Sequence, residues 1–129
     1  MKADANWQRL FILFSGLFGL AGVALAAAAS HMGDERLLGG ASTMCLAHAP
    51  ALLALALAYD KLKTAAPAGV LLLAGTLLFA GDLVNRHVVG TGFFPMSAPT
   101  GGFLMMGGWL VVAIGAFFKR PLSISAKTQ

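Results

Sequence analysis

The sequence has 129 residues, of which 58% are hydrophobic and only 11% are charged, and its mean hydropathy is +0.80. Water-soluble domains carry about 25% charged residues, so this composition excludes an ordinary soluble surface and indicates a membrane protein. The length suits one domain rather than two. We read the formal net charge of +4 as a topology signal and not as nucleic-acid binding, because Lys and Arg placement orients membrane proteins.

The first apolar segment runs from about residue 10 to residue 30. An apolar run of about 20 residues has a spanning length, whereas the core of a secretory signal has about 7–15 residues. We therefore expect a retained transmembrane helix, with Gly33 as the helix stop. Gly16, Gly19 and Gly22 recur every three positions, which predicts a face of close packing against a neighbouring helix.

Two further apolar segments follow, over about 38–59 and 68–89, with a basic turn at 60–64 between them. The first of these contains His48 and Pro50 well inside the segment. Because proline removes a backbone donor, a kink or a tilted helix is expected there. Both segments are long enough to span the membrane.

Residues 90–102 contain four Gly and two Pro, a composition too broken for a regular helix and too apolar for a solvated linker. We predict an ordered loop folded onto the outer rim. The fourth span follows over 101–118, with Thr100 as a candidate N-cap. Its glycines repeat every seven residues, at Gly101, Gly108 and Gly115, and predict a second packing face.

The four spans predict an all-α, polytopic membrane protein: a four-transmembrane-helix bundle in a single domain, 1–129, with a polar tail at 119–129. Both termini and the second loop then share one side, which holds seven basic residues: Lys2, Arg9, Lys61, Lys63, Lys119, Arg120 and Lys127. The other side holds Arg36 and Arg86. This bias predicts that both termini lie in the cytoplasm.

Ionisable residues inside the spans predict a polar cluster. Asp82 and Arg86 stand four residues apart and can pair on one helix face. With a rise of about 1.5 Å per residue, Asp82 falls in the outer half of the membrane, His48 near the midplane and His31 at the outer rim. Such side chains avoid lipid and find partners, so we predict that these four residues meet beneath the Gly/Pro loop. A structural role and a role in binding a ligand, an ion or a proton both stay open.

Other chemistries have weaker support. A haem held by His31 and His87 is geometrically conceivable. For zinc, the sequence has no Cys/His spacing of the kind that zinc sites show. No Ser or Cys has partners spaced as in a nucleophilic triad, and Met105 and Met106 are explained better by packing than by copper binding. We therefore expect no metal, no cofactor and no enzymatic activity. The expected function is a non-enzymatic accessory protein, or a module that responds to a small ligand or to protons.

A different class of function stays open as the alternative, namely a transporter or channel component that works as an oligomer. The expected partners are membrane lipids and either further copies of the chain or a larger membrane complex, with no nucleic acid.

Five stretches, in this order, resemble the domain of unknown function 423 family of small bacterial membrane proteins, which is similar to eukaryotic transmembrane protein 256. They are residues 26–31, 45–53, 78–83, 94–102 and 108–110. The resemblance covers 16–118 and implies a four-helix inner-membrane protein without an assigned activity. It also implies that the family's characteristic histidines fall on His31 and His48. One departure is that 26–30 reads AAAAS where the family commonly has Gly-Ala-Phe-Gly-Ala before the histidine.

Overall fold

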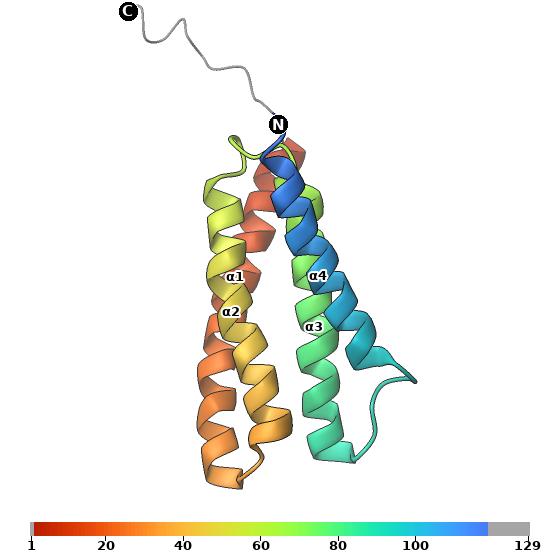
Figure 1. Ribbon diagram of the computed structural model, residues 1–129. Helices are drawn as coiled ribbons and strands as arrows, with labels where there is room; N and C mark the ends of the chain where they lie inside the picture. The colour runs from red at the N-terminus through yellow and green to blue at the C-terminus, as the bar shows by residue number, and fades with distance from the viewer. Residues whose placement is uncertain (1, 119–129) are drawn as a thin grey trace, which may run out of the picture.

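The computed structural model describes residues 2–118 and is all-helical over this range (Figure 1). Its long helices are α1 (Lys2–Met32), α2 (Gly40–Leu57), α3 (Ala65–Val89) and α4 (Ser97–Gly115), and a short π-helical turn, η1 (Glu35–Gly39), leads into α2. The described residues contain four spans that are long and apolar enough to cross a membrane. The predicted fold, a polytopic four-helix membrane protein, is confirmed.

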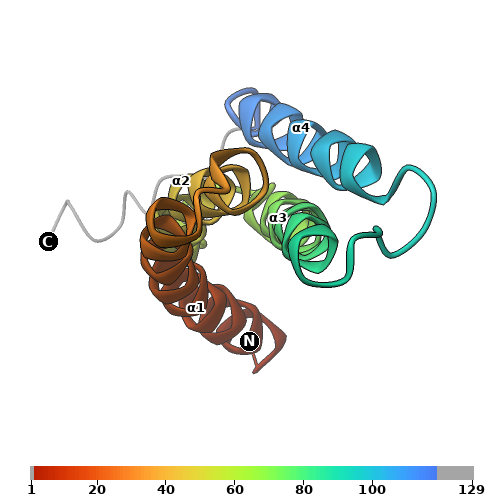
Figure 2. The same ribbon diagram turned by 90° about the horizontal axis from the view of Figure 1, so that it is seen from below.

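The four helices form two antiparallel hairpins, α1 with α2 and α3 with α4. The hairpins meet where α2 packs on α3, so that α1 and α4 lie on the outside (Figure 2). In an apolar 18-residue stretch of each span, 44% of residues are buried for the α2 span and 39% for the α3 span, against 17% for α1 and 22% for α4. The two inner helices therefore supply most of the buried positions, while α1 and α4 expose wide faces to lipid.

The helices do not end where the apolar runs end. α1 begins at Lys2 and α3 begins at Ala65, both before the predicted spans. α1 includes the polar residues that precede its apolar run, and α3 gains the apolar residues 65–67. α4 covers Ser97–Gly115 rather than 101–118. Pro99 lies in its first turn, where a missing backbone N–H breaks no helical hydrogen bond, so this proline does not stop the helix.

The turn between α1 and α2 is compact. Gly33 has a φ of +69° directly after the last residue of α1, which confirms the predicted stop. Asp34 then caps η1, since its Oδ1 accepts a hydrogen bond of 3.0 Å from the backbone N of Leu37. α2 continues without a break from Gly40 to Leu57, with Pro50 inside it.

The interface between α1 and α2 repeats every seven residues along both helices. Three of the described hydrogen bonds cross it: Gln8 Nε2 to Ala56 O (3.1 Å), Ser15 Oγ to Ala49 O (2.6 Å) and Ser42 Oγ to Gly22 O (2.6 Å). A Cβ at Gly22 would lie 2.6 Å from the Leu46 side chain, whereas one at Gly16 would meet nothing within 4 Å. The predicted close packing is therefore confirmed at Gly22, and Gly16 lies away from this interface.

The second predicted packing face is confirmed along the whole of α4. A Cβ at Gly101 would lie 2.7 Å from the backbone N of Phe79, one at Gly108 would lie 2.7 Å from Leu72, and one at Gly115 would meet Leu62 and Thr64. Since the contact at Gly101 is with backbone atoms, it cannot be relieved by a change of side-chain rotamer. Glycine at these positions lets α4 approach α3 closely.

We expect Gly101→Ala to lower the stability of the protein by about 1–3 kcal/mol, because the added methyl group forces α3 and α4 apart. The matched control is Gly102→Ala, where a Cβ meets nothing within 4 Å and the higher helix propensity of alanine favours the folded state. Thermal unfolding in mild detergent, followed by circular dichroism, compares the two variants. Equal unfolding temperatures would contradict the packing assigned to Gly101.

Candidate functional site

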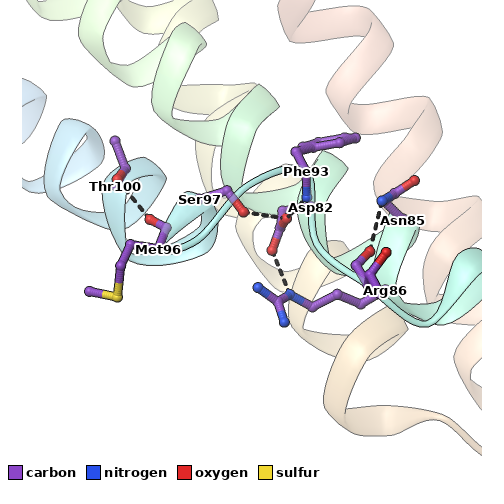
Figure 3. Close-up of polar contacts among 8 residues, drawn as sticks. Asp82, Asn85, Arg86, Phe93, Met96, Ser97 and Thr100 are labelled. Atoms are coloured by element: carbon purple, nitrogen blue, oxygen red, sulfur yellow. Dashed lines mark hydrogen bonds and ion pairs between the residues drawn. The ribbon is translucent and has the colours of Figure 1, made fainter.

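Asp82 lies on α3 with an exposed fraction of 0% and is held by three segments of the chain. Its Oδ2 accepts a hydrogen bond of 2.7 Å from Nε of Arg86, on the same helix. Its Oδ1 accepts 2.8 Å from the backbone N of Phe93, in the loop, and 2.5 Å from Oγ of Ser97, at the start of α4 (Figure 3). One carboxylate therefore fixes the loop and the first turn of α4 against α3.

The predicted pair of Asp82 and Arg86 is present, and the loop passes directly over it. The Arg86 side chain is 38% exposed, so its guanidinium reaches the surface while Nε pairs with the buried carboxylate. A Cβ at Gly92 would lie 2.6 Å from both Asp82 Oδ1 and Arg86 Nη2. Because any side chain there would collide with the ion pair, glycine is required at this position.

The loop from Gly90 to Met96 is held by further hydrogen bonds. Asn85 Nδ2 donates to the backbone O of Thr91 over 2.8 Å, and Thr100 Oγ1 donates to the backbone O of Met96 over 2.7 Å (Figure 3). Met96 has a φ of +67°, a region that residues other than glycine rarely adopt. It sits between the tethered loop and the tethered first turn of α4, which hold it in this conformation.

His48 lies in the middle of α2, is 4% exposed, and uses both ring nitrogens. Its Nδ1 is 2.8 Å from the backbone O of Met44, and its Nε2 is 3.1 Å from Nε1 of Trp109 on α4. An indole N–H can only donate, so Nε2 accepts and Nδ1 carries the hydrogen that is donated to Met44. The two bonds together require the neutral imidazole in a single tautomer.

A cleft of about 420 Å³ opens beside His48 where α2, α3 and α4 meet. Its lining includes Met44, His48, Phe79, Met105, Met106 and Trp109. A second cleft of about 350 Å³ lies between α1 and α3, and Phe14, Phe18, Cys45, Thr76 and Gly81 are among its lining residues. Both clefts are lined mainly by apolar side chains, and the first one also borders the pair of His48 and Trp109.

His87 and Asp34 form a second contact between the hairpins. Nδ1 of His87 lies 2.7 Å from Oδ2 of Asp34, and both side chains are partly exposed. Asp34 lies between the first two spans. Its hydrogen bond with His87, followed by the one from the backbone N of Leu37, lowers the pKa of the Asp34 carboxyl below its ordinary value of 3.8.

The four residues predicted to form one cluster lie in separate places. Asp82 and Arg86 are paired, whereas the hydrogen bonds of His48 go to Met44 and Trp109. His31 is exposed in the last turn of α1. Within residues 2–118, no group of three or more His, Cys, Asp or Glu side chains could hold a metal, and each buried side-chain N or O atom has a hydrogen-bond partner.

Several site residues were not singled out from the sequence, namely Asp34, Gly92, Ser97 and Trp109. For Ser97 a usable signal existed, since a serine before a proline and an apolar run is typical of a helix start. Trp109 and Asp34 gave no comparable signal, because their partners lie 61 and 53 residues away in the chain.

The fold and the satisfied polar groups in its spans define a small polytopic membrane protein built from two helical hairpins. The profile of the family described as "Protein of unknown function (DUF423)" matches residues 25–102, and the chain belongs to this family. No curated protein and no solved structure matches the chain. The matched residues contain His48 and the whole Asp82 site, whereas Met105, Met106 and Trp109 lie beyond them.

We expect Asp82→Ala to be strongly destabilising, because it removes the acceptor of the Ser97 hydroxyl and the Phe93 N–H. A buried donor left without a partner costs about 1–3 kcal/mol. Limited proteolysis should also cut the loop at 90–96 more readily, alongside a lower unfolding temperature in detergent. Asn85→Ala is the matched control, since it removes an exposed hydrogen bond to the same loop. Equal losses in the two variants would argue against a central role for Asp82.

A pH dependence follows from the Asp34 contact. Because the folded state lowers the pKa of Asp34 below 3.8, its stabilising effect is complete above the ordinary value and is lost as the pH falls through the lowered one. We expect the difference in unfolding temperature between the natural protein and Asp34→Asn to shrink below about pH 4. A difference that stays constant down to about pH 2 would contradict this coupling.

Proposed function

We propose that this protein is a non-enzymatic accessory protein of the bacterial inner membrane that responds to protons, with His48 as the responsive group. One observation carries the proposal. Both nitrogens of a buried histidine are bonded in an arrangement that only neutral imidazole can make, and one of these bonds joins α2 to α4. The protonation state of His48 is thereby coupled to the contact between the two hairpins.

A second proton on His48 would go to Nε2, the atom that accepts from Trp109. Nε2 would then be a donor facing the indole N–H, so the hydrogen bond between them would be lost. The resulting imidazolium would stand beside a cleft whose lining residues carry no charged side chain, and an ionised group in apolar surroundings is costly unless it is paired. Protonation therefore favours a state in which Trp109 moves away from His48 and the cleft widens.

The Asp82 site has a positioning role in this proposal. Three donors from α3, the loop and α4 occupy the carboxylate, and they set where α4 begins. Trp109 lies three turns further along the same helix. Fixing the start of α4 against α3 therefore helps to keep the indole opposite His48.

The placement of the charged residues supports the proposed orientation. The start of α1, the turn after α2 and the end of α4 lie at one end of the molecule (Figure 1), and this end carries Arg9, Lys61 and Lys63. The opposite end carries Arg36 and Arg86. Lys119, Arg120 and Lys127 lie outside the described residues. By the positive-inside rule we assign the first end to the cytoplasm.

The alternative of an oligomeric transporter or channel component has less support, since the polar residues that a conduction path needs lie in separate sites among the described residues. For that reason we keep the proton-responsive accessory role as the proposal.

The test follows the intrinsic fluorescence of Trp109, which reports whether the indole moves away from His48. In a Trp7→Phe background, Trp109 is the remaining one of the two tryptophans. We expect its fluorescence in lipid nanodiscs to shift reversibly to longer wavelength as the pH is lowered, because histidine is the side chain that can take up a proton here. Adding His48→Gln should abolish the shift, because a glutamine oxygen can accept from the indole N–H but does not titrate. His31→Gln, at an exposed site, should leave it intact. A shift that survives His48→Gln would refute the proposal.

A further inference from the structure

The cleft beside His48 gathers side chains that are soft metal ligands. Three of the six methionines in the sequence line it. Met44 lies on α2 one turn before His48, while Met105 and Met106 lie on α4 one turn before Trp109. Two helices thus place three methionines, a histidine and a tryptophan around one space of about 420 Å³.

We propose that this cleft binds one soft monovalent metal ion, Cu(I) or its analogue Ag(I), through Nε2 of His48 and the thioether sulfurs of the cleft methionines. Thioethers are soft ligands that select Cu(I), and imidazole also suits copper. The adjacent pair Met105 and Met106, read in isolation, is explained by packing. The fold adds Met44 and His48 to the same space, and this combination of ligands is what favours a metal site.

Charge decides between a monovalent and a divalent ion. The cleft lies within the spans, and none of its lining residues is an acid or a base other than His48. The cost of placing an ion in a medium of low dielectric constant rises with the square of its charge. No carboxylate or thiolate of the lining offsets that cost, so a divalent ion is disfavoured. A monovalent ion with neutral ligands is the charge state that such a cleft can accept.

His48 is already in the protonation state that metal binding needs. Its hydrogen is on Nδ1 and is donated to Met44 O, so Nε2 has a free lone pair once Trp109 turns away. Binding would therefore release no proton. The indole of Trp109, whose ring centroid is 5.7 Å from that of His48, could then face the bound cation, an arrangement that aromatic rings stabilise.

The cleft is open on the lipid-facing side of α4 and is not enclosed. Met106 is 59% exposed and Trp109 is 44% exposed, and Gly102, which lines the cleft, adds no side chain. Cys45 is the single cysteine of the sequence and lines the other cleft, between α1 and α3. Its thiol would compete for a soft ion in any measurement, so the test requires a variant without it.

The experiment titrates the full-length Cys45→Ala, Trp7→Phe protein in detergent with Ag(I), and with Cu(I) under reducing conditions. We expect quenching of Trp109 fluorescence that saturates at one ion per chain, and the same stoichiometry from elemental analysis after desalting. Replacing Met44, Met105 and Met106 together by leucine should weaken binding by about ten-fold or more, because leucine keeps the volume but removes the sulfur.

In the matched control, leucine replaces Met32 and Met96, which are exposed and lie outside the cleft. This variant should bind the metal ion as tightly as the parent protein does. No retained metal, or equal affinity in the triple leucine variant, would overturn the proposal. The outcome is separable from the proton response of His48, since that response is measured without metal. The triple leucine variant keeps His48 and Trp109, so it should still show the pH-dependent fluorescence shift even where metal binding is lost.

Discussion

The end of the second hairpin depends on one requirement, that a carboxylate inside an apolar span must have its hydrogen-bonding capacity met by the protein. Asp82 meets it with donors from its own helix, from the loop and from the first turn of α4. The consequences extend along the chain. The loop passes so close to the ion pair of Asp82 and Arg86 that a Cβ at Gly92 would collide with it. Met96, at the end of the loop, has a positive φ. α4 then starts at a defined place and packs its glycines on α3.

The contacts within the hairpins differ in kind from those between them. Within the first hairpin, Ser15 and Ser42 donate hydrogen bonds to backbone oxygens across α1 and α2. Within the second, the glycines of α4 at seven-residue spacing allow close packing on α3. None of these groups titrates near neutral pH. Between the hairpins, two of the described hydrogen bonds involve histidines: Trp109 Nε1 donates to Nε2 of His48, and Nδ1 of His87 pairs with Asp34. Each hairpin is therefore a fixed unit, and the surface where the two units meet is the part that can respond to its surroundings.

The features that could be predicted from the sequence are those that depend on residues close together in the chain. The spans, the stop at Gly33, the glycines of α4 and the spacing of Asp82 and Arg86 are patterns within one helix or one turn. Grouping His31, His48, Asp82 and Arg86 relied on depth alone. Depth follows from counting residues, but the direction in which a side chain points depends on helix rotation and on the register between helices. His48 turns toward Trp109, and Asp82 turns toward Ser97, so their successive predicted depths did not bring them together.

Membership of the family and the chemistry of the cleft concern different parts of the chain. The matched residues, 25–102, include Asp82 and every described partner of its carboxylate, so the arrangement that positions α4 lies entirely within the family region. The matched residues also include Met44 and His48 but end before Met105, Met106 and Trp109. One wall of the cleft is thus part of the family region, while the facing wall belongs to the remainder of α4. The family match therefore covers the histidine and the scaffold that positions α4, whereas the side chains that face His48 across the cleft are known from the structure of this chain.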